Sequence, residues 1–515
     1  MARHHYYYYP ALVMLLALLA AACTNLPDDY EKSNSSALHD TTSTTLGKSV
    51  ARVAAQHPGE SGFVLLRYGR DAFNLRVALS DVAEKTLDVQ VYIWEADETG
   101  RIFAERLLRA ANRGVRVRIL VDDLGLRTSD NIVSAMDAHP NMEVRIFNPF
   151  ANRSSNLFEF IFDLGRVNHR MHNKIFIVDN SAAIVGGRNI GDHYFGVNQD
   201  TNFRDLDIGA IGPIVPEISN VFDYFWQGEW SYPIEALVAT PPTAEEVSRL
   251  HERFQVDIEA GSYPYDIEQD QAELLRDIAD TSGEFIWAKG EIVWDDPAPQ
   301  EKLDDPNDRN RIATNLQEKV VSLRQSLDIE SAYFVLGDSS IELIQNLIDK
   351  GIRVRILTNS LASNDVLAAH AGHALYREEI LKTGAELYEL RPDSNVIKKT
   401  WRGESRAGLH TKALVFDQES IFVGSYNLDP RSANINTEAG IYVESQELAT
   451  QLLEYMKVGK QPDNAYQLFL DEQGDLVWTS LEDGVEVHHH VDPHSSWGQR
   501  LLARFFGMLP IESQL

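Results

Sequence analysis

The order of hydrophobic and polar positions predicts the same three elements at two places along the chain. Residues 86–93 alternate apolar and polar side chains, as a strand with one buried face does. Residues 102–113 carry apolar side chains at helical spacing, and residues 114–121 alternate again. The first half therefore contains a predicted strand, helix and strand.

The second half repeats this order. Residues 326–333 predict a strand, residues 341–350 a helix and residues 351–358 a second strand. Gly114 opens the last strand of the first repeat, and Gly351 opens the equivalent strand of the second. A strand-helix-strand order implies parallel pairing with covering helices. We therefore predict an α/β fold of two duplicated domains, each a mixed, largely parallel sheet flanked by helices.

Arginines occupy alternate positions in the last strand of each repeat, at Arg116 and Arg118 and at Arg353 and Arg355. Successive side chains of a strand point to opposite faces, so each pair lies on one face. We expect solvent-facing positions at a sheet edge rather than substrate contacts.

Two further apolar runs, residues 175–178 and 413–416, carry the same polar residues around them. Both fit the pattern H-x-K-x4-D-x6-G-[GS]-x-N without a gap, and the spacing between the copies is nearly that between the two repeats. The polar positions are His172, Lys174, Asp179 and Asn189 in the first copy and His410, Lys412, Asp417 and Asn427 in the second. A duplicated strand alone would not retain all of these polar positions, so the pattern indicates a function.

The chemistry of these residues suits a phosphodiester. A histidine and a lysine two positions apart on a strand point to the same face. Lysine and asparagine side chains donate to non-bridging oxygens, while one histidine attacks phosphorus and the other protonates the leaving oxygen. The motifs contain no convincing set of metal ligands, and we expect no cofactor. Asp179 and Asp417 end their strands, which favours a structural role within the site.

The paired motifs resemble the H-K-D motifs of the phospholipase D superfamily, and within it the bacterial cardiolipin synthase branch of the C type. The resemblance spans nearly all of the chain after the N-terminal leader. Other stretches that carry it are Leu87–Trp94, Arg145–Phe150, Gly186–Asp192, Leu357–Ala362 and Asn427–Ser432. It implies one active site at a pseudo-two-fold interface, a covalent phosphohistidine and no metal.

A histidine that acts as nucleophile or acid needs its other ring nitrogen held, and a carboxylate serves this purpose. The resemblance gives this role to Glu438, which follows the second motif. When Ile208 is aligned with Ile441, Asp205 is its counterpart in the first half, and Asp207 is the alternative.

The resemblance implies a phosphatidyltransferase at a membrane surface that makes cardiolipin with phosphatidylglycerol as acceptor. His172 is the expected nucleophile and His410 the acid and base, although pseudo-symmetry leaves the reverse open. The donor is a second phosphatidylglycerol or phosphatidylethanolamine, and some relatives of the C type need a small partner protein. Three alternatives remain: a hydrolase that releases phosphatidic acid, a nuclease, and a non-catalytic lipid-binding lipoprotein.

Length and charge narrow the class of protein. A chain of 515 residues exceeds one ordinary domain. The net charge of -30 argues against nucleic acid as a partner, because nucleic-acid binders carry a basic surface.

The first 23 residues predict a signal peptide. Residues 11–22 are apolar, too short to span a bilayer, and end at Cys23, the only cysteine of the chain. This arrangement resembles a lipobox, in which the cysteine is lipidated; an ordinary signal cut near Ala22 is the alternative. A lipobox implies a lipoprotein in a bacterial envelope that faces the periplasm, and Thr24 points to the outer membrane.

The rest of the chain divides by composition. Residues 24–49 are polar and predict a flexible tether. The two domains are expected at residues 50–260 and 285–460, and residues 461–515 predict a hairpin and a C-terminal helix. This helix, residues 497–510, either lies at a membrane interface or packs on the domain.

Overall fold

The structure is a computed structural model of the chain. It describes residues 26–153, 159–160, 163–238, 240–250, 252, 285–297, 312–396, 405–509 and 514. The predicted signal peptide with Cys23, and residues 261–284 between the two predicted domains, lie outside the described residues. Among the described residues, no helix is long and apolar enough to cross a bilayer.

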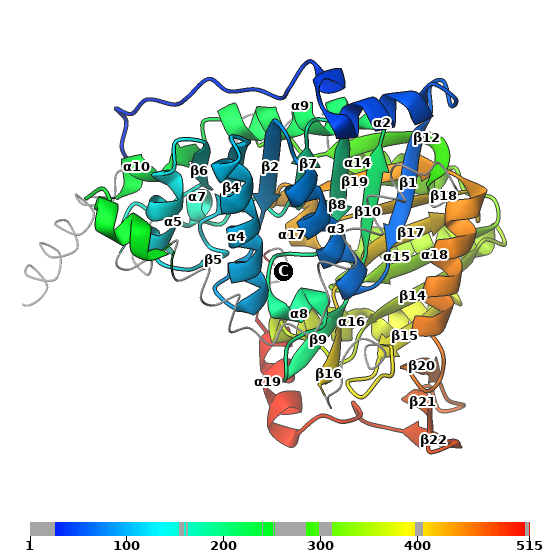
Figure 1. The fold of residues 1–515 in the computed structure, drawn as a ribbon. Coiled ribbons are helices and arrows are strands. Elements are labelled where there is room, and N and C mark those ends of the chain that lie inside the picture. The colour runs from blue at the N-terminus through cyan, green and yellow to red at the C-terminus, as the bar shows by residue number, and fades with distance from the viewer. Residues whose placement is uncertain are drawn as a thin grey trace, which may run out of the picture.

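The first half is a mixed sheet with helices on its faces (Figure 1). Its strands are β1 (Ser61–Leu66), β2 (Thr86–Val91), β4 (Arg116–Asp122), β6 (Met142–Phe147), β7 (Ile175–Val178), β8 (Ala182–Gly186), β10 (Asp207–Ile211) and β11 (Ser231–Pro233). Its helices are α2 (Thr45–Ala54), α3 (Gly69–Val82), α4 (Glu98–Asn112), α5 (Asp130–Asp137), α7 (Leu164–Val167), α8 (Asp192–Phe195), α9 (Ile214–Gln227) and α10 (Ile234–Leu237), with the 3-10 turn η1 (Thr41–Ser43). The strand order is β11-β6-β4-β2-β7-β8-β10-β1.

The second half repeats this arrangement. Its strands are β12 (Ile286–Trp294), β13 (Ser326–Ser331), β14 (Arg353–Asn359), β15 (Glu386–Leu390), β17 (Lys412–Phe416), β18 (Ser420–Gly424), β19 (Ala439–Glu444), β20 (Ala465–Leu470), β21 (Leu476–Glu482) and β22 (Val485–His489). Its helices are α14 (Ile312–Val321), α15 (Asp338–Asp349), α16 (Leu367–Thr383), α17 (Pro430–Asn434), α18 (Gln446–Gly459) and α19 (Trp497–Gly507). The order β15-β14-β13-β17-β18-β19-β12 matches β6-β4-β2-β7-β8-β10-β1 strand for strand. The duplicated α/β fold is therefore confirmed.

The sheets are mixed, as expected, but parallel pairing is less extensive than the sequence predicts. Within the two main sheets of the described residues it is confined to β2-β4-β6 and β13-β14-β15, where a helix returns the chain to the same end of the sheet. The motif strands form tight antiparallel hairpins, β7-β8 and β17-β18. Asp179 and Asp417 have φ of 51° at these turns, and the next residue is also left-handed, a geometry that suits a hairpin.

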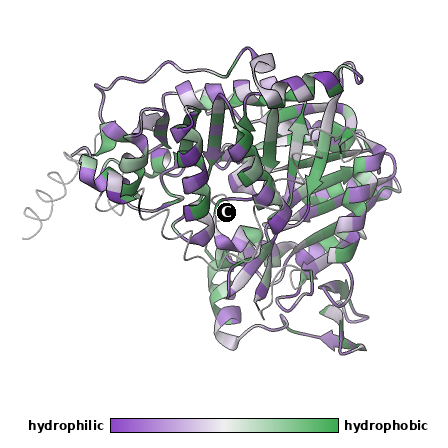
Figure 2. Cartoon of the chain, in the orientation of Figure 1, coloured by the Kyte–Doolittle hydropathy of each residue, from purple (hydrophilic) through white to green (hydrophobic). Residues whose placement is uncertain are grey.

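Strand β12 connects the halves, because it pairs antiparallel with both β1 and β19. One apolar cluster then fills the space between the two sheets. It contains Ile175, Ile177, Ala183, Val185, Ala413, Val415, Ile421 and Val423, all at most 2% exposed. In Figure 2 the hydrophobic colour is concentrated on these strands. The faces of the two motif hairpins are thus buried against one another, which holds the two motifs in one place.

The arginines of β4 correct the expectation of edge positions. Strand β4 lies between β2 and β6, and Arg118 is fully buried, with its Nε 2.6 Å and its Nη2 2.9 Å from the Asp88 carboxylate. Arg355 pairs with Asp328 in the equivalent place, 2.7 Å away. These ion pairs link parallel neighbouring strands, so Arg118 and Arg355 stabilise the sheet, whereas Arg353 is exposed as expected.

The described part of the predicted tether also differs from expectation, because residues 26–40 lie along the first half. Arg116, Arg118 and Arg145 donate hydrogen bonds of 2.6–2.9 Å to backbone carbonyls of residues 33–36. The sequence shows that the segment is polar, but it does not show which arginines bind its backbone. These hydrogen bonds hold residues 33–36 on the first half, although the composition of the segment predicts a flexible tether.

Candidate active site

The two motifs meet at one place because short segments pair across the halves. Strand β9 (Thr201–Arg204) runs parallel to β16 (Arg406–Leu409), and the chain continues into Asp205 on one side and His410 on the other. An isolated parallel bridge joins Met171 to Thr437, directly before His172 and Glu438. Each junction therefore sets a histidine of one half beside a carboxylate of the other.

Both histidines are held by these carboxylates. Nδ1 of His172 lies 2.8 Å from Oε2 of Glu438, and Nδ1 of His410 lies 2.7 Å from Oδ2 of Asp205. All four residues are buried, and the carboxylates are at most 1% exposed. A carboxylate on Nδ1 fixes the tautomer with its free lone pair on Nε2, so each imidazole presents Nε2 for chemistry.

The two carboxylates have different surroundings. Glu438 accepts hydrogen bonds from the hydroxyls of Ser425 and Ser432, in addition to its contact with His172. Burial acts to raise the pKa of Glu438, but the charges of His172 and Lys174 outweigh it and lower that pKa. In the first half, burial raises the pKa of Asp205. The ionised form of Glu438 is thus stabilised by two hydroxyl donors in addition to His172.

Gly187 stands where the second motif has Ser425, and it gives Asp205 its room. A Cβ at Gly187 would meet Oδ1 of Asp205 at 2.2 Å. The residue at the G-[GS] position therefore matches the carboxylate in its own half. It is a glycine beside Asp205 and a serine, which donates a hydrogen bond, beside Glu438.

Each lysine lies beside the histidine of its own motif, and the lysines carry the positive charge of the site. Nζ of Lys174 donates to the carbonyl of His172 and Nζ of Lys412 to that of His410, each at 2.6 Å. Burial lowers the pKa of both lysines and of both histidines, to about 4 for His172, and the neighbouring lysines lower the histidine values further. A bound anion would relieve this clustering of positive charge, so the site is poised for a phosphate group.

The two asparagines have unused hydrogen-bonding capacity. Oδ1 of Asn189 accepts from the backbone nitrogen of Ile93 at 3.0 Å, whereas its buried Nδ2 has no hydrogen-bond partner among the described residues. The buried Oδ1 of Asn427 also has no hydrogen-bond partner among the described residues. Rotation of this amide by 180° exchanges Oδ1 and Nδ2, so that a donor takes the place of the unpaired acceptor. Buried polar groups are nearly always satisfied, so these amides are suited to a ligand.

Aromatic rings surround the catalytic groups, and sequence reasoning did not single them out. The ring centroid of Tyr92 lies 5.0 Å from that of His172, and the centroid of Tyr194 lies 5.1 Å from that of His410. Nζ of Lys174 lies 5.4 Å from the Tyr92 ring, and Nζ of Lys412 lies 5.8 Å from the Tyr333 ring. Tyr92 and Tyr333 follow the equivalent strands β2 and β13 at one and two residues after the strand end, so an ungapped alignment of the repeats sets Tyr92 against Ala332 and does not reveal the pair.

The remaining predicted carboxylates do not contact the histidines. Asp179 accepts hydrogen bonds from the backbone nitrogens of residues 84–86, and Asp417 accepts from those of residues 324–326, at 2.7–3.1 Å. Each aspartate thereby joins the motif hairpin to the start of the neighbouring strand. Asp207, the alternative to Asp205, pairs with Arg76 and Arg188 at 3.0 and 3.3 Å.

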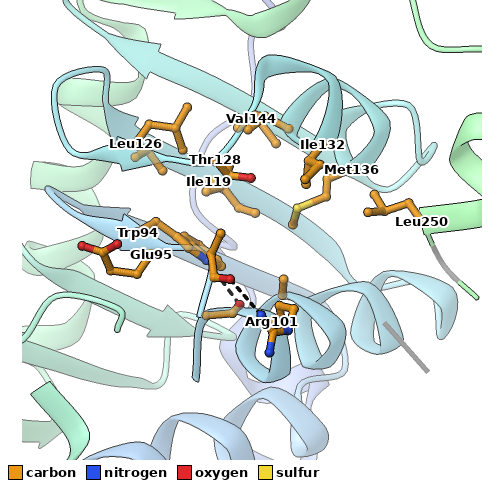
Figure 3. Close-up of a pocket in the computed structure, with 15 residues that line it drawn as sticks. Trp94, Glu95, Arg101, Ile119, Leu126, Thr128, Ile132, Met136, Val144 and Leu250 are labelled. Atoms are coloured by element: carbon orange, nitrogen blue, oxygen red, sulfur yellow. Dashed lines mark hydrogen bonds between the residues drawn. The ribbon is translucent and has the colours of Figure 1, made fainter. Parts of the chain in front are cut away.

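An apolar cavity lies beside the site in the first half (Figure 3). Its volume is about 90 Å³, and it opens to solvent between the sheet and helices α4 and α5. Figure 3 shows aliphatic side chains of Ile119, Ile132, Met136 and Val144 around it, with Glu95 and Arg101 among the lining residues. Its wall begins at the short strand β3 (Trp94–Glu95), one residue after Ile93, the backbone partner of Asn189.

Comparison with known proteins agrees with this geometry. A family model described as cardiolipin synthase, PLD-like domain, matches residues 78–226 and 318–458. Cardiolipin synthase C of Escherichia coli (strain K12) is 38% identical over 471 residues, which cover 91% of this chain and 99% of that protein. The major cardiolipin synthase of Bacillus subtilis (strain 168) is 24% identical over 390 residues, 76% of this chain and 67% of that protein.

A solved structure shows the same fold at low sequence identity. Phosphatidylserine synthase of Haemophilus influenzae Rd KW20 aligns with a TM-score of 0.59 and 14% identity, over 90% of this chain and all of that one. The matched family model covers both halves, and with it both H-K-D motifs. The chain therefore belongs to the cardiolipin synthase-like members of the phospholipase D superfamily.

Proposed function

We propose that the protein makes cardiolipin by transferring a phosphatidyl group to the hydroxyl of phosphatidylglycerol. The observation that carries this proposal is the pair of reciprocal histidine–carboxylate contacts around two buried lysines. This arrangement provides a nucleophile, a proton carrier and a phosphate-binding centre. Relatives named cardiolipin synthase support the choice of phospholipid as substrate.

In the first step, Nε2 of His172 attacks phosphorus while His410 protonates the departing alcohol oxygen. The bond from phosphorus to that oxygen breaks as the phosphorus–nitrogen bond forms. Lys174, Lys412 and the two amides stabilise the charge on the non-bridging oxygens. Glu438 suits the nucleophile's side, because a firmly ionised carboxylate stabilises the cationic phosphoimidazolium.

In the second step, the neutral His410 accepts the proton of the incoming hydroxyl, whose oxygen attacks phosphorus. The phosphorus–nitrogen bond breaks, and His172 returns to its starting state. The donor is a second phosphatidylglycerol, which releases glycerol, or phosphatidylethanolamine, which releases ethanolamine.

The apolar cavity suits a short part of one acyl chain of the phosphatidyl group. Its lining is aliphatic between α4, α5 and the sheet, and its wall starts beside the Ile93–Asn189 contact. Hydrocarbon gains free energy from such surroundings in proportion to the area that it buries. A chain held there leaves the phosphate at the histidines.

We also propose that lipidated Cys23 anchors the protein in a bacterial envelope membrane, facing the periplasm. The lipobox-like sequence before Cys23 supports this location. Residues 26–40 lie along the first half, so the anchor and the enzyme body are separated by only a short stretch of chain.

Product analysis tests the proposed reaction. Purified protein, residues 24–515, is incubated with phosphatidylglycerol vesicles, with and without phosphatidylethanolamine, and lipids are identified by mass spectrometry. Cardiolipin that is absent with His172→Ala and with His410→Ala is the expected result. Detection of phosphatidic acid without cardiolipin would show that the protein hydrolyses the lipid rather than transferring its phosphatidyl group. Adding a candidate partner protein from the same envelope then tests the need for an activator.

A further inference from the structure

Helix α19 exposes large apolar side chains to solvent. Trp497 is 72% exposed, Leu501 52%, Phe505 50% and Met508, just after the helix, 75%. Leu502 and Leu509 add to the same surface at 47% and 37%. We call these six residues the α19 patch. Soluble monomers rarely leave a contiguous apolar area of several large side chains uncovered, so this patch indicates an interaction site.

The helix separates a packed side from an exposed side. Ala503 is buried, and Gly507 lies against Leu375 and the Ala371 carbonyl of α16. At about 100° per residue, the α19 patch spans an arc of about 140° that otherwise contains only Gly498. Arg500 and Arg504 border one side of this arc, and the helix has no acidic residue. The helix therefore packs on the domain and retains a free apolar side.

The patch lies on the same side of the molecule as the segments that lead into the active site. Figure 1 shows α19 at the lower edge, on the side of α8, β9 and β16, the two strands that lead into Asp205 and His410. Beyond α19, Gln514 contacts Asn168, which also accepts a hydrogen bond from Arg431. Leu509 and Gln514 are five residues apart, so the end of the patch is within about 18 Å of this contact.

We propose that the α19 patch docks on the lipid bilayer and brings the active site to its membrane-bound substrate. This inference rests on the proposed function for its choice of partner. Arginines beside an apolar arc match an interface at which side chains enter the acyl region and guanidinium groups meet anionic headgroups. The whole chain has a net charge of -30, so a basic border at this one helix is not a general property of the surface.

Vesicle flotation tests the docking without any need for catalysis. The probe is vesicles of phosphatidylcholine with phosphatidylglycerol, and the protein is residues 24–515, which lacks the lipid anchor. Trp497→Ser with Leu501→Ser should reduce the fraction bound at least about tenfold, because each substitution removes an exposed apolar side chain. Val321→Ser with Val485→Ser, at sites 54% and 63% exposed elsewhere, should bind as wild type. Arg500→Gln with Arg504→Gln should weaken binding only to vesicles with anionic lipid.

The experiment separates this inference from the proposed reaction. His172→Ala should float like wild type, and the α19 double variant should turn over a monomeric short-chain phosphatidylglycerol at the wild-type rate. Unchanged flotation of the double variant, with the circular dichroism of the native protein, would overturn the docking. Loss of a dimer in light scattering, with flotation unchanged, would assign the patch to a second copy of the chain.

Discussion

The contacts between a histidine of one half and a carboxylate of the other make a prediction that separates the two chemical steps. Glu438→Gln keeps a hydrogen-bond acceptor beside His172 and removes the charge, and Asp205→Asn does the same beside His410. The matched pair tests which histidine each half supports. If each carboxylate instead supported the histidine of its own half, Glu438→Gln would affect His410 and Asp205→Asn would affect His172.

The geometry sets the size of the effect. The contact of 2.8 Å places the charge centres of an imidazolium and a carboxylate about 4 Å apart, where the attraction is about 4 kcal/mol at an effective dielectric constant of about 20. The amide retains a neutral hydrogen bond worth about 1 kcal/mol. The variants should therefore lose about 3 kcal/mol at the step that charges the histidine, or about two orders of magnitude in rate.

A donor with a 4-nitrophenol leaving group identifies the step, because this group departs without a proton. The burst of nitrophenol reports formation of the covalent intermediate alone. Glu438→Gln should slow the burst about a hundredfold, whereas Asp205→Asn should leave it near the wild-type rate and still slow release of glycerol from phosphatidylglycerol. An exchange of the two outcomes would make His410 the nucleophile. Rates within threefold of wild type for both variants on both donors would refute the role of these contacts.

Three further predictions concern stability and substrate choice. Burial lowers the pKa of His370 to about 4, so the folded protein holds this side chain neutral where the unfolded chain would bind a proton. The contribution of His370 to the free energy of unfolding is therefore complete above about pH 6.5 and is lost as the pH falls towards 4. His370→Asn should therefore reduce the drop in unfolding free energy between pH 7 and 5 by about 2 kcal/mol in urea titrations, and an unchanged slope would contradict this. Asp417→Ala should lower the free energy of unfolding by about 2–3 kcal/mol in urea titrations, because the backbone nitrogens of residues 324–326 lose their acceptor. The kcat of the folded variant should be nearly unchanged. A hundredfold loss of kcat would show a direct role of Asp417 in the reaction. Leu126→Trp places a larger side chain in the cavity lining and should lower kcat/KM at least about fivefold for long-chain relative to short-chain phosphatidylglycerol. Equal effects on the two substrates would show that the cavity does not bind substrate.

The duplicated fold and the identity of the site could be predicted from the sequence because both depend on local patterns. The repeat of strand, helix and strand fixes the elements, and the two H-K-D motifs mark the groups that the structure brings together. Position at the end of a strand was also enough to predict the structural role of Asp179 and Asp417. These inferences need only periodicity and the chemistry of side chains.

Long-range pairing could not be predicted in the same way. The pairing of His172 with Glu438 depends on the bridge between Met171 and Thr437, which lie in different halves of the chain. Arg118 alternates as an edge residue would, and only the order of strands reveals that it is buried against Asp88. Residues 26–40 have the composition of a free segment, and arginines distant in sequence hold them on the first half.

Detection of the covalent intermediate tests whether His172 is the nucleophile. Protein of residues 24–515 is mixed with phosphatidylglycerol in detergent, quenched, digested and analysed by mass spectrometry. We expect a phosphatidyl group on His172 of the wild-type protein and none in His172→Ala. With the 4-nitrophenyl donor, more of it should accumulate in Asp205→Asn, because transfer to the acceptor is slowed while formation is not. Steady formation of cardiolipin with no adduct on either histidine would contradict a phosphohistidine intermediate.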